Sequence, residues 1–236
     1  MSTFLTARWQ ELIMANYAVP PAALAQYVPH GTELDLYEGV CYVSLVGFLF
    51  SDTRLKGISI PFHTQFEEVN LRFYVRRQEG NTWRRGTVFI RELVPKPAIS
   101  LVANLLYGEH YRTVAMRHRW ERSDQQATFL YAWRLGTEWQ HIAATVSPVS
   151  IPLIPDSVEA FITEHYWGYT RLGPQRTSAY QVAHPSWETY PVLSADISCD
   201  GARLYGPAFG MIGRDAPASV LVATGSEVSV LERTFI

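Results

Sequence analysis

The segment Arg91–Pro97 places one of the chain's two lysines between two prolines. The chain has eighteen arginines, which can supply a positive charge wherever only a charge is needed. A lysine, in contrast, can lose its proton and act as a nucleophile. A neutral Lys96 amine would attack a ketone or aldehyde to form an imine, which serves as an electron sink for decarboxylation, aldol cleavage or proton exchange. Lys56 lies in a polar turn. Lys96 is therefore the candidate nucleophile; the alternative is that its side chain points into solvent.

A second candidate group lies on the segment 66–77, the clearest strand pattern in the chain. One face carries Glu68, Asn70, Arg72 and Tyr74, and the other carries Val69, Leu71, Phe73 and Val75. If the apolar face packs under other elements, the polar face lines an interior and binds a small polar ligand, with arginine holding a carboxylate through two hydrogen bonds. If the apolar face fills the interior, the polar face is solvated. Glu67 points away from Glu68, which argues against a carboxylate pair.

The elements that follow must position Lys96. A turn at 78–82 returns the chain as a strand over 87–93, so that this second arm of a hairpin delivers Arg91 and Glu92 to the lysine. Beyond it, the apolar spacing predicts a helix that begins at Pro97 and stops at Gly108. Lys96 is then at a helix N-terminus, where the helix dipole and burial both favour the neutral amine.

The whole pattern predicts about ten strands and three helices without βαβ alternation. We expect an α+β, mainly β fold over residues 1–236 as a single domain, an antiparallel barrel or closed sheet with helices at its edges. For residues 3–17 the sequence is compatible with either an amphipathic helix or an extended arm. Other predicted helices are a short one over 22–27 and one that begins at Asp156, which has capping-box spacing to Glu159.

Composition narrows the class of protein. The apolar fraction of 47% excludes disorder, and a net charge of −2 gives no electrostatic reason to expect nucleic acid or a membrane surface as partner. Cys41 and Cys199 form no disulfide framework, no signal peptide is recognisable, and we expect a cytoplasmic protein. The seven histidines show no metal-ligand spacing, so no metal is expected, and no nucleotide-binding or hydrolase motif is present.

The stretches 66–75 and 88–92 resemble the uncharacterised YqjF-like family, domain of unknown function 2071, as do 39–50, 107–118 and 165–169. That family is similar to the acetoacetate decarboxylase-like superfamily, which implies a cone-shaped antiparallel barrel around a mostly apolar cavity. In the decarboxylases an Arg-Glu pair precedes Pro-Lys-Lys, whose first lysine forms the imine and whose second activates it. Arg91-Glu92 and Pro95-Lys96 resemble this pattern, and Glu68 resembles a cavity-lining glutamate. Pro97 replaces the second lysine, which removes the usual activating cation.

Two hypotheses follow from these residues. In the first, the chain is a Schiff-base lyase of decarboxylase type that acts on a small keto acid or carbonyl compound without a cofactor. Its catalytic residues are Lys96, Glu68 and Glu92, and its substrate-binding residues are Arg72, Asn70, Arg91, Tyr74 and His63. In the second, the chain is a non-catalytic barrel that binds a small molecule in an aromatic-lined apolar cavity. A homodimer is left open.

Overall fold

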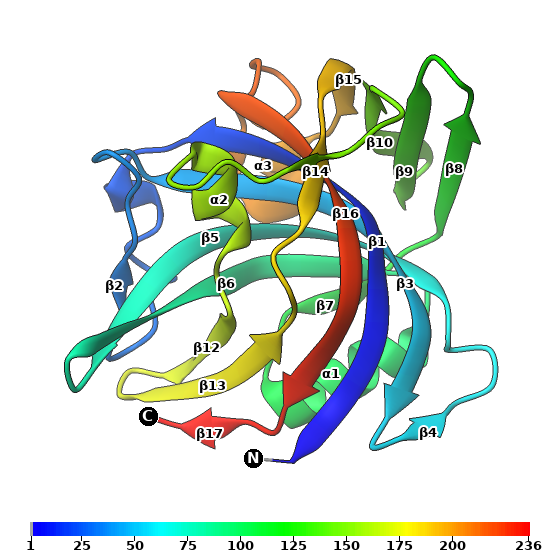
Figure 1. The fold of residues 1–236 in the computed structure, drawn as a ribbon. Helices are drawn as coiled ribbons and strands as arrows, with labels where there is room; N and C mark the ends of the chain where they lie inside the picture. The colour runs from blue at the N-terminus through cyan, green and yellow to red at the C-terminus, as the bar shows by residue number, and fades with distance from the viewer. Residues whose placement is uncertain (1) are drawn as a thin grey trace.

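The computed structural model describes residues 2–236, in which seven long strands form a closed ring (Figure 1). In ring order these strands are β16 (Ser219–Leu231), β1 (Thr3–Ala18), β3 (Tyr42–Leu55), β5 (Phe66–Glu79), β6 (Thr82–Val94), β12 (Trp167–Gly173) and β13 (Arg176–Ala183). The ring closes because β13 pairs with β16, Val182 opposite Val230. The predicted mainly β fold with a closed sheet is confirmed, and residues 3–17 form a strand.

The ring is not purely antiparallel, because β12 pairs with β6 in parallel at Trp167 and Gly86. Between these two strands the chain forms α1 (Pro97–Tyr107), α2 (Val158–Thr163) and most of an outer sheet, and this long connection lets the chain return in the same direction. Shorter strands extend the ring sheet: β2 (Glu33–Leu34), β4 (Ile58–Ser59), β7 (Tyr111–Thr113), β11 (Ile151–Pro152), β14 (Glu188–Tyr190) and β17 (Thr234–Phe235).

A second sheet of four strands packs against the outside of the ring, at the upper right of Figure 1. Its order is β15 (Val192–Ser198), β10 (Glu138–Val146), β9 (Ala127–Leu135) and β8 (Met116–Arg122). The outward side chains of β5 join those of β9 and β10 in one buried apolar cluster, which we call the outer core. The packing is close at Gly47 on β3, where a Cβ would lie 2.7 Å from Ile142 Cγ2. The apolar face of β5 is therefore buried outside the ring, and its polar face points inward.

The helices α1, α2 and α3 (Gly201–Tyr205) pack on different parts of the ring. Helix α1 contributes to the wall of the interior, α2 packs in the apolar cluster of the interior, and α3 packs in the outer core. Single 3₁₀ turns lie at Pro21–Ala23 and Pro207–Phe209. The predicted limits of α1 are confirmed: Pro97 is its first residue, and Gly108 ends it in the left-handed conformation with φ 73°. The prediction that Asp156 caps the next helix was wrong, because Ser157 accepts the hydrogen bond from the Ala160 N–H.

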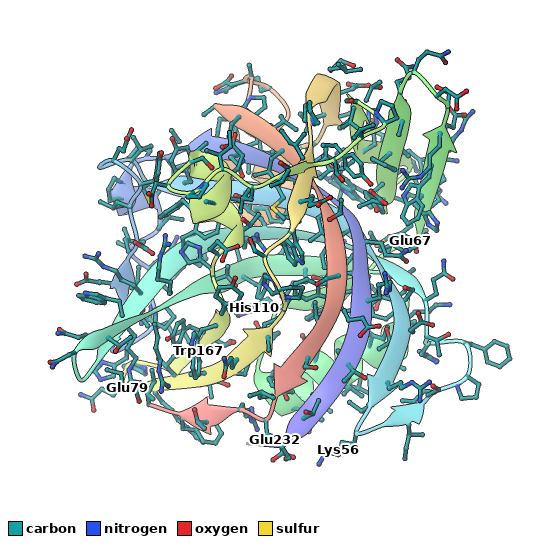
Figure 2. All side chains as sticks on the ribbon, in the orientation of Figure 1. Lys56, Glu67, Glu79, His110, Trp167 and Glu232 are labelled. Atoms are coloured by element: carbon teal, nitrogen blue, oxygen red, sulfur yellow. The ribbon has the colours of Figure 1, made fainter. Side chains whose placement is uncertain are left out.

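Strands β1 and β17, which lead to the two termini, lie at the same end of the molecule (Figure 1). Lys56 and Glu232 form an ion pair of 3.4 Å at this end (Figure 2). No helix within residues 2–236 has the length and apolar character needed to cross a membrane.

Candidate functional site

The interior of the ring contains a cavity of about 240 Å³. Strands β1, β3, β5, β6, β13 and β16 contribute side chains to its wall, and α1 lines it through Ala98, Ile99, Val102 and Ala103. The wall has two parts of different character. One part is aromatic, and the other carries buried polar and ionisable groups. Such a pairing of apolar surface with a few polar groups is typical of small-molecule sites.

The aromatic wall comes from β1, β3, the start of β5 and the segment before β14. It consists of Trp9, Phe48, Phe50, Phe66, His184 and Trp187. The Phe50 and Phe66 rings stack with centroids 4.6 Å apart, and His184 stacks on Trp187 at 4.2 Å. This wall presents broad apolar faces that suit a hydrocarbon or ring portion of a ligand.

The polar wall begins with the inward face of β5. Glu68, Asn70 and Arg72 all line the cavity, so the structure selects the interior alternative for this polar face. Each is almost fully buried, with 3%, 1% and 7% of its surface exposed. Asn70 donates through Nδ2 to Glu68 Oε1 at 2.9 Å. Burying three such groups inside a ring is costly unless they find partners, so their presence marks a functional surface.

A β-bulge decides which residues of β6 face the cavity. Arg72 pairs with Phe89 and Leu71 with Arg91, so Ile90 is the extra residue between them. Phe89 lines the cavity, whereas Arg91 points the other way and donates to the Leu204 carbonyl on α3. Beyond the bulge Glu92 is again on the inward side, opposite Asn70. The predicted substrate-binding residue Arg91 and the predicted catalytic residue Glu92 therefore point to opposite sides of β6.

Three buried carboxyl groups, Glu68, Glu92 and Glu109, come together at the polar end. Tyr111 donates its hydroxyl to Glu68 Oε2 at 3.0 Å, and Thr170 and Tyr180 donate to Glu109 Oε1 at 2.6 and 2.9 Å. The His110 N–H donates to Glu92 Oε2 at 3.3 Å.

The three carboxyls share a low-dielectric environment, which changes their ionisation. Burial raises the pKa of Glu68 to about 7, and burial together with the charge of Glu68 raises that of Glu109 to about 7. Burial and the charges of Glu109 and Glu68 raise the pKa of Glu92 well above its ordinary value. At neutral pH the cluster therefore retains protons and can both donate and accept hydrogen bonds.

Arg72 is the buried cation of the cavity. Its Nη2 donates to the Ile162 carbonyl at 3.3 Å and contacts Met14 Sδ at 3.5 Å, and its Nε has no partner. Among the ion pairs of residues 2–236, none involves Arg72. The charge of Arg72 acts on Glu68 only from a distance, as one of the effects that oppose the rise of its pKa. Arg72 thus retains capacity for an anionic ligand.

Lys96 lies outside the cavity wall. It is the half-buried N-cap residue of α1. Burial would raise the pKa of Glu67, but the His118 hydrogen bond and, with a smaller effect, the charge of Lys96 lower it below its ordinary value. Glu67 in turn binds His118 Nδ1 at 2.7 Å on the outer side of the ring, beside β8 (Figure 2). The cavity is lined from α1 by the helix residues that follow Lys96.

Of the two remaining predicted residues, His63 lies at the cavity wall and Tyr74 does not. His63 lines the cavity and is held by the Pro61 carbonyl, 2.9 Å from its Nδ1. Tyr74 is buried, and its hydroxyl lies 2.6 Å from Ser44 Oγ rather than at the cavity wall. Of the eight predicted residues, the structure brings Glu68, Asn70, Arg72 and His63 to the cavity.

Other residues of the site escaped the sequence analysis. Glu109, Tyr111, His165 and Tyr180 all line the cavity. Glu109 directly follows Gly108, the predicted end of the helix. This position was the only sequence signal that could have indicated a site residue here. The ring brings the other three together from separate strands and loops. No group of three His, Cys, Asp or Glu side chains in residues 2–236 is arranged to hold a metal ion.

Solved structures identify the fold that this ring of strands forms. The fold is that of the acetoacetate decarboxylase-like proteins. All of this chain superposes on 90% of acetoacetate decarboxylase from Legionella pneumophila subsp. pneumophila str. Philadelphia 1, with a TM-score of 0.66 and 13% identity. It also superposes on 91% of the enduracididine biosynthesis enzyme MppR in complex with pyruvate, with a TM-score of 0.66 and 15% identity.

Sequence comparison identifies the family. Residues 6–227 match DUF2071, described as "Uncharacterized conserved protein", and the chain belongs to that family. The uncharacterized protein YqjF of Bacillus subtilis (strain 168) is 25% identical over 175 residues, which cover 69% of this chain. The match spans 65% of the length of YqjF.

Proposed function

We propose that this protein binds a small organic acid in the ring cavity, with the carboxylate on Arg72 and the hydrocarbon portion against the aromatic wall. The proposal follows the second hypothesis of the sequence analysis rather than the imine hypothesis. MppR, a protein of the same fold, is described in complex with pyruvate, a small carboxylate.

The observation that supports this proposal most directly is the state of Arg72. A guanidinium that is 7% exposed, lines a cavity, and has no ion-pair partner in residues 2–236 is costly to bury. A ligand carboxylate would supply the missing charge and two parallel hydrogen bonds. The protonated carboxyls of the polar wall reduce the repulsion that an anionic ligand would otherwise meet.

The position of Lys96 bears on the alternative chemistry. An imine requires the amine to reach the ligand carbonyl, and Lys96 is not part of the cavity wall. Binding of an organic acid by Arg72 needs no lysine. The two hypotheses therefore make opposite predictions for Lys96 variants.

Calorimetric titration with hexanoate and 2-oxohexanoate tests the proposal. We expect Arg72→Met to weaken binding by about 10- to 100-fold, because a charge-assisted hydrogen-bond pair is lost. Arg72→Lys keeps the charge without the planar fork and should give intermediate affinity. Arg76→Met is the matched control, since Arg76 is a partly exposed arginine on the same strand, lies outside the cavity wall and pairs with Glu33.

The same titration of Lys96→Met is the second part of the experiment. We expect this variant to bind both acids with the affinity of the unchanged protein. Borohydride reduction in the presence of 2-oxohexanoate should leave Lys96 unmodified. A reduced adduct on Lys96 would overturn the proposal in favour of the imine hypothesis. Failure of both acids to bind, or equal binding by Arg72→Met, would also overturn it.

A further inference from the structure

His165 is a buried histidine at the polar end of the cavity that the proposed function does not yet use. It follows α2, lines the cavity, and its side chain is 1% exposed. Its Nε2 lies 3.1 Å from Asp35 Oδ2, and Arg85 Nε donates to the same oxygen at 2.6 Å. The Nε2 side of the imidazole is therefore bound by a carboxylate that also forms an ion pair with Arg85.

The partners of His165 define its tautomer. Burial would raise the pKa of Asp35, but the hydrogen bonds from His165 and Arg85 lower it below its ordinary value, so Asp35 is ionised and accepts. Burial lowers the pKa of His165 to about 4, so the ring is neutral at pH 7. The single ring proton is then on Nε2, where it is donated to Asp35, and Nδ1 carries a free lone pair.

That lone pair has no partner in residues 2–236. In the described part of the chain, residues 2–236, ten buried side-chain N and O atoms lack a hydrogen-bond partner, and six of them belong to residues of the cavity wall: Trp9, Thr53, Asn70, Arg72, Glu109 and His165. Buried polar atoms in native proteins are nearly always paired, and such a concentration in one cavity points to a polar ligand.

His165 and Arg72 are close enough to act on one molecule. The Arg72 Cζ lies 5.7 Å from the centre of the Tyr74 ring, and the His165 ring lies 4.7 Å from the same centre. Arg72 also donates to the carbonyl of Ile162, three residues before His165. A donor for an anion and an acceptor for a hydroxyl thus both lie beside the Tyr74 ring and belong to residues of one cavity wall.

We propose that the ligand of this cavity is a hydroxy acid, whose hydroxyl donates to Nδ1 of His165 while its carboxylate binds Arg72. This inference rests on the proposed function and adds a specificity-determining residue to it. A keto acid or an unsubstituted acid has no hydroxyl to donate and leaves Nδ1 buried without a partner. Leaving a buried acceptor unpaired disfavours such ligands by about tenfold or more.

The experiment compares hexanoate, 2-oxohexanoate, 2-hydroxyhexanoate and 3-hydroxyhexanoate by calorimetric titration of the full chain. We expect at least one hydroxy acid to bind about tenfold tighter than hexanoate and 2-oxohexanoate. His165→Gln places an amide N–H where Nε2 donates to Asp35 but removes the acceptor at Nδ1, so it should abolish this preference. His165→Asn can place its amide oxygen near the position of Nδ1 and should retain part of the preference.

The 15N resonance of His165 Nδ1 gives a readout that does not depend on the variants. It should shift on binding of the preferred hydroxy acid and stay unchanged with hexanoate. If the four acids bind with equal affinity, or if His165→Gln keeps the preference, the role of His165 is overturned and the Arg72 proposal stands. If no acid binds, the proposed function fails first.

Discussion

Glu68 is a carboxyl group that the protein keeps protonated up to about neutral pH, since burial raises its pKa to about 7. The unfolded chain exposes the same group to water, where it ionises near its ordinary value of about 4.5. Between these two values the folded state binds a proton that the unfolded state has lost. The contribution of Glu68 to stability therefore falls as pH rises from about 4.5 to about 7, and is constant above that.

We predict that Glu68→Gln flattens the dependence of unfolding free energy on pH. An amide cannot ionise, so the variant should lose less stability than the unchanged protein between about pH 5 and pH 8, by on the order of 2 to 3 kcal/mol. Urea denaturation at the two pH values measures the effect. Glu138→Gln, at an exposed site at the start of β10, is the control and should leave the dependence unchanged. Equal slopes for Glu68→Gln and the control would contradict the prediction.

At the scale of elements, the pairing of β12 with β13 supports one of the buried carboxyls. Gly168 pairs with Tyr180, and a Cβ on Gly168 would overlap the Tyr180 ring. That ring cannot move easily, because it packs edge-on against Tyr107 at 5.2 Å and its hydroxyl donates to Glu109. The glycine is thus required by the close approach of a ring to the strand.

We predict that Gly168→Ala lowers the free energy of unfolding by about 1 to 3 kcal/mol, the usual cost of overpacking. Gly173→Ala is a matched control on the same strand, since nothing lies within 4 Å of its Cβ position. That control should remain within about 0.5 kcal/mol of the unchanged protein. Chemical denaturation of both variants checks the difference, and equal stabilities would mean that the Tyr180 ring is free to move.

At the scale of the whole molecule, the buried apolar side chains form two separate clusters. The outer core between the ring and the second sheet contains fully buried side chains such as Phe129 and Trp133. The other cluster lines the ring interior and includes cavity residues such as Phe48. Stability and ligand contact should therefore respond to different substitutions.

We predict that Phe129→Leu lowers the free energy of unfolding by about 1 kcal/mol through lost apolar burial, with organic-acid affinity unchanged within about twofold. Phe48→Leu at the cavity wall should instead weaken that affinity. Denaturation and calorimetric titration of both variants measure the two effects. If Phe129→Leu weakened binding as much as Phe48→Leu, the outer core and the cavity would be coupled rather than separate.

Several features followed from local sequence alone. The alternation over 66–77 predicted β5, and the limits of α1 followed from Pro97 and Gly108, because side-chain period and backbone freedom are local properties. The mainly β class followed from many such strands without βαβ alternation. The same local pattern identified Glu68, Asn70 and Arg72 as one face, but it left open which way that face points.

Only the tertiary structure decided that direction, because the outer sheet buries the apolar face of β5 from outside the ring. The bulge at Ile90 turned Arg91 away from the cavity and returned Glu92 inward, a change of register that strict alternation does not predict. Lys96, which drew attention by its rarity and its prolines, lies outside the cavity wall, whereas His165 and Glu109 reach it from distant segments. The physical reason is that ring closure, strand register and long-range packing, rather than local preference, determine which side chains share a buried space.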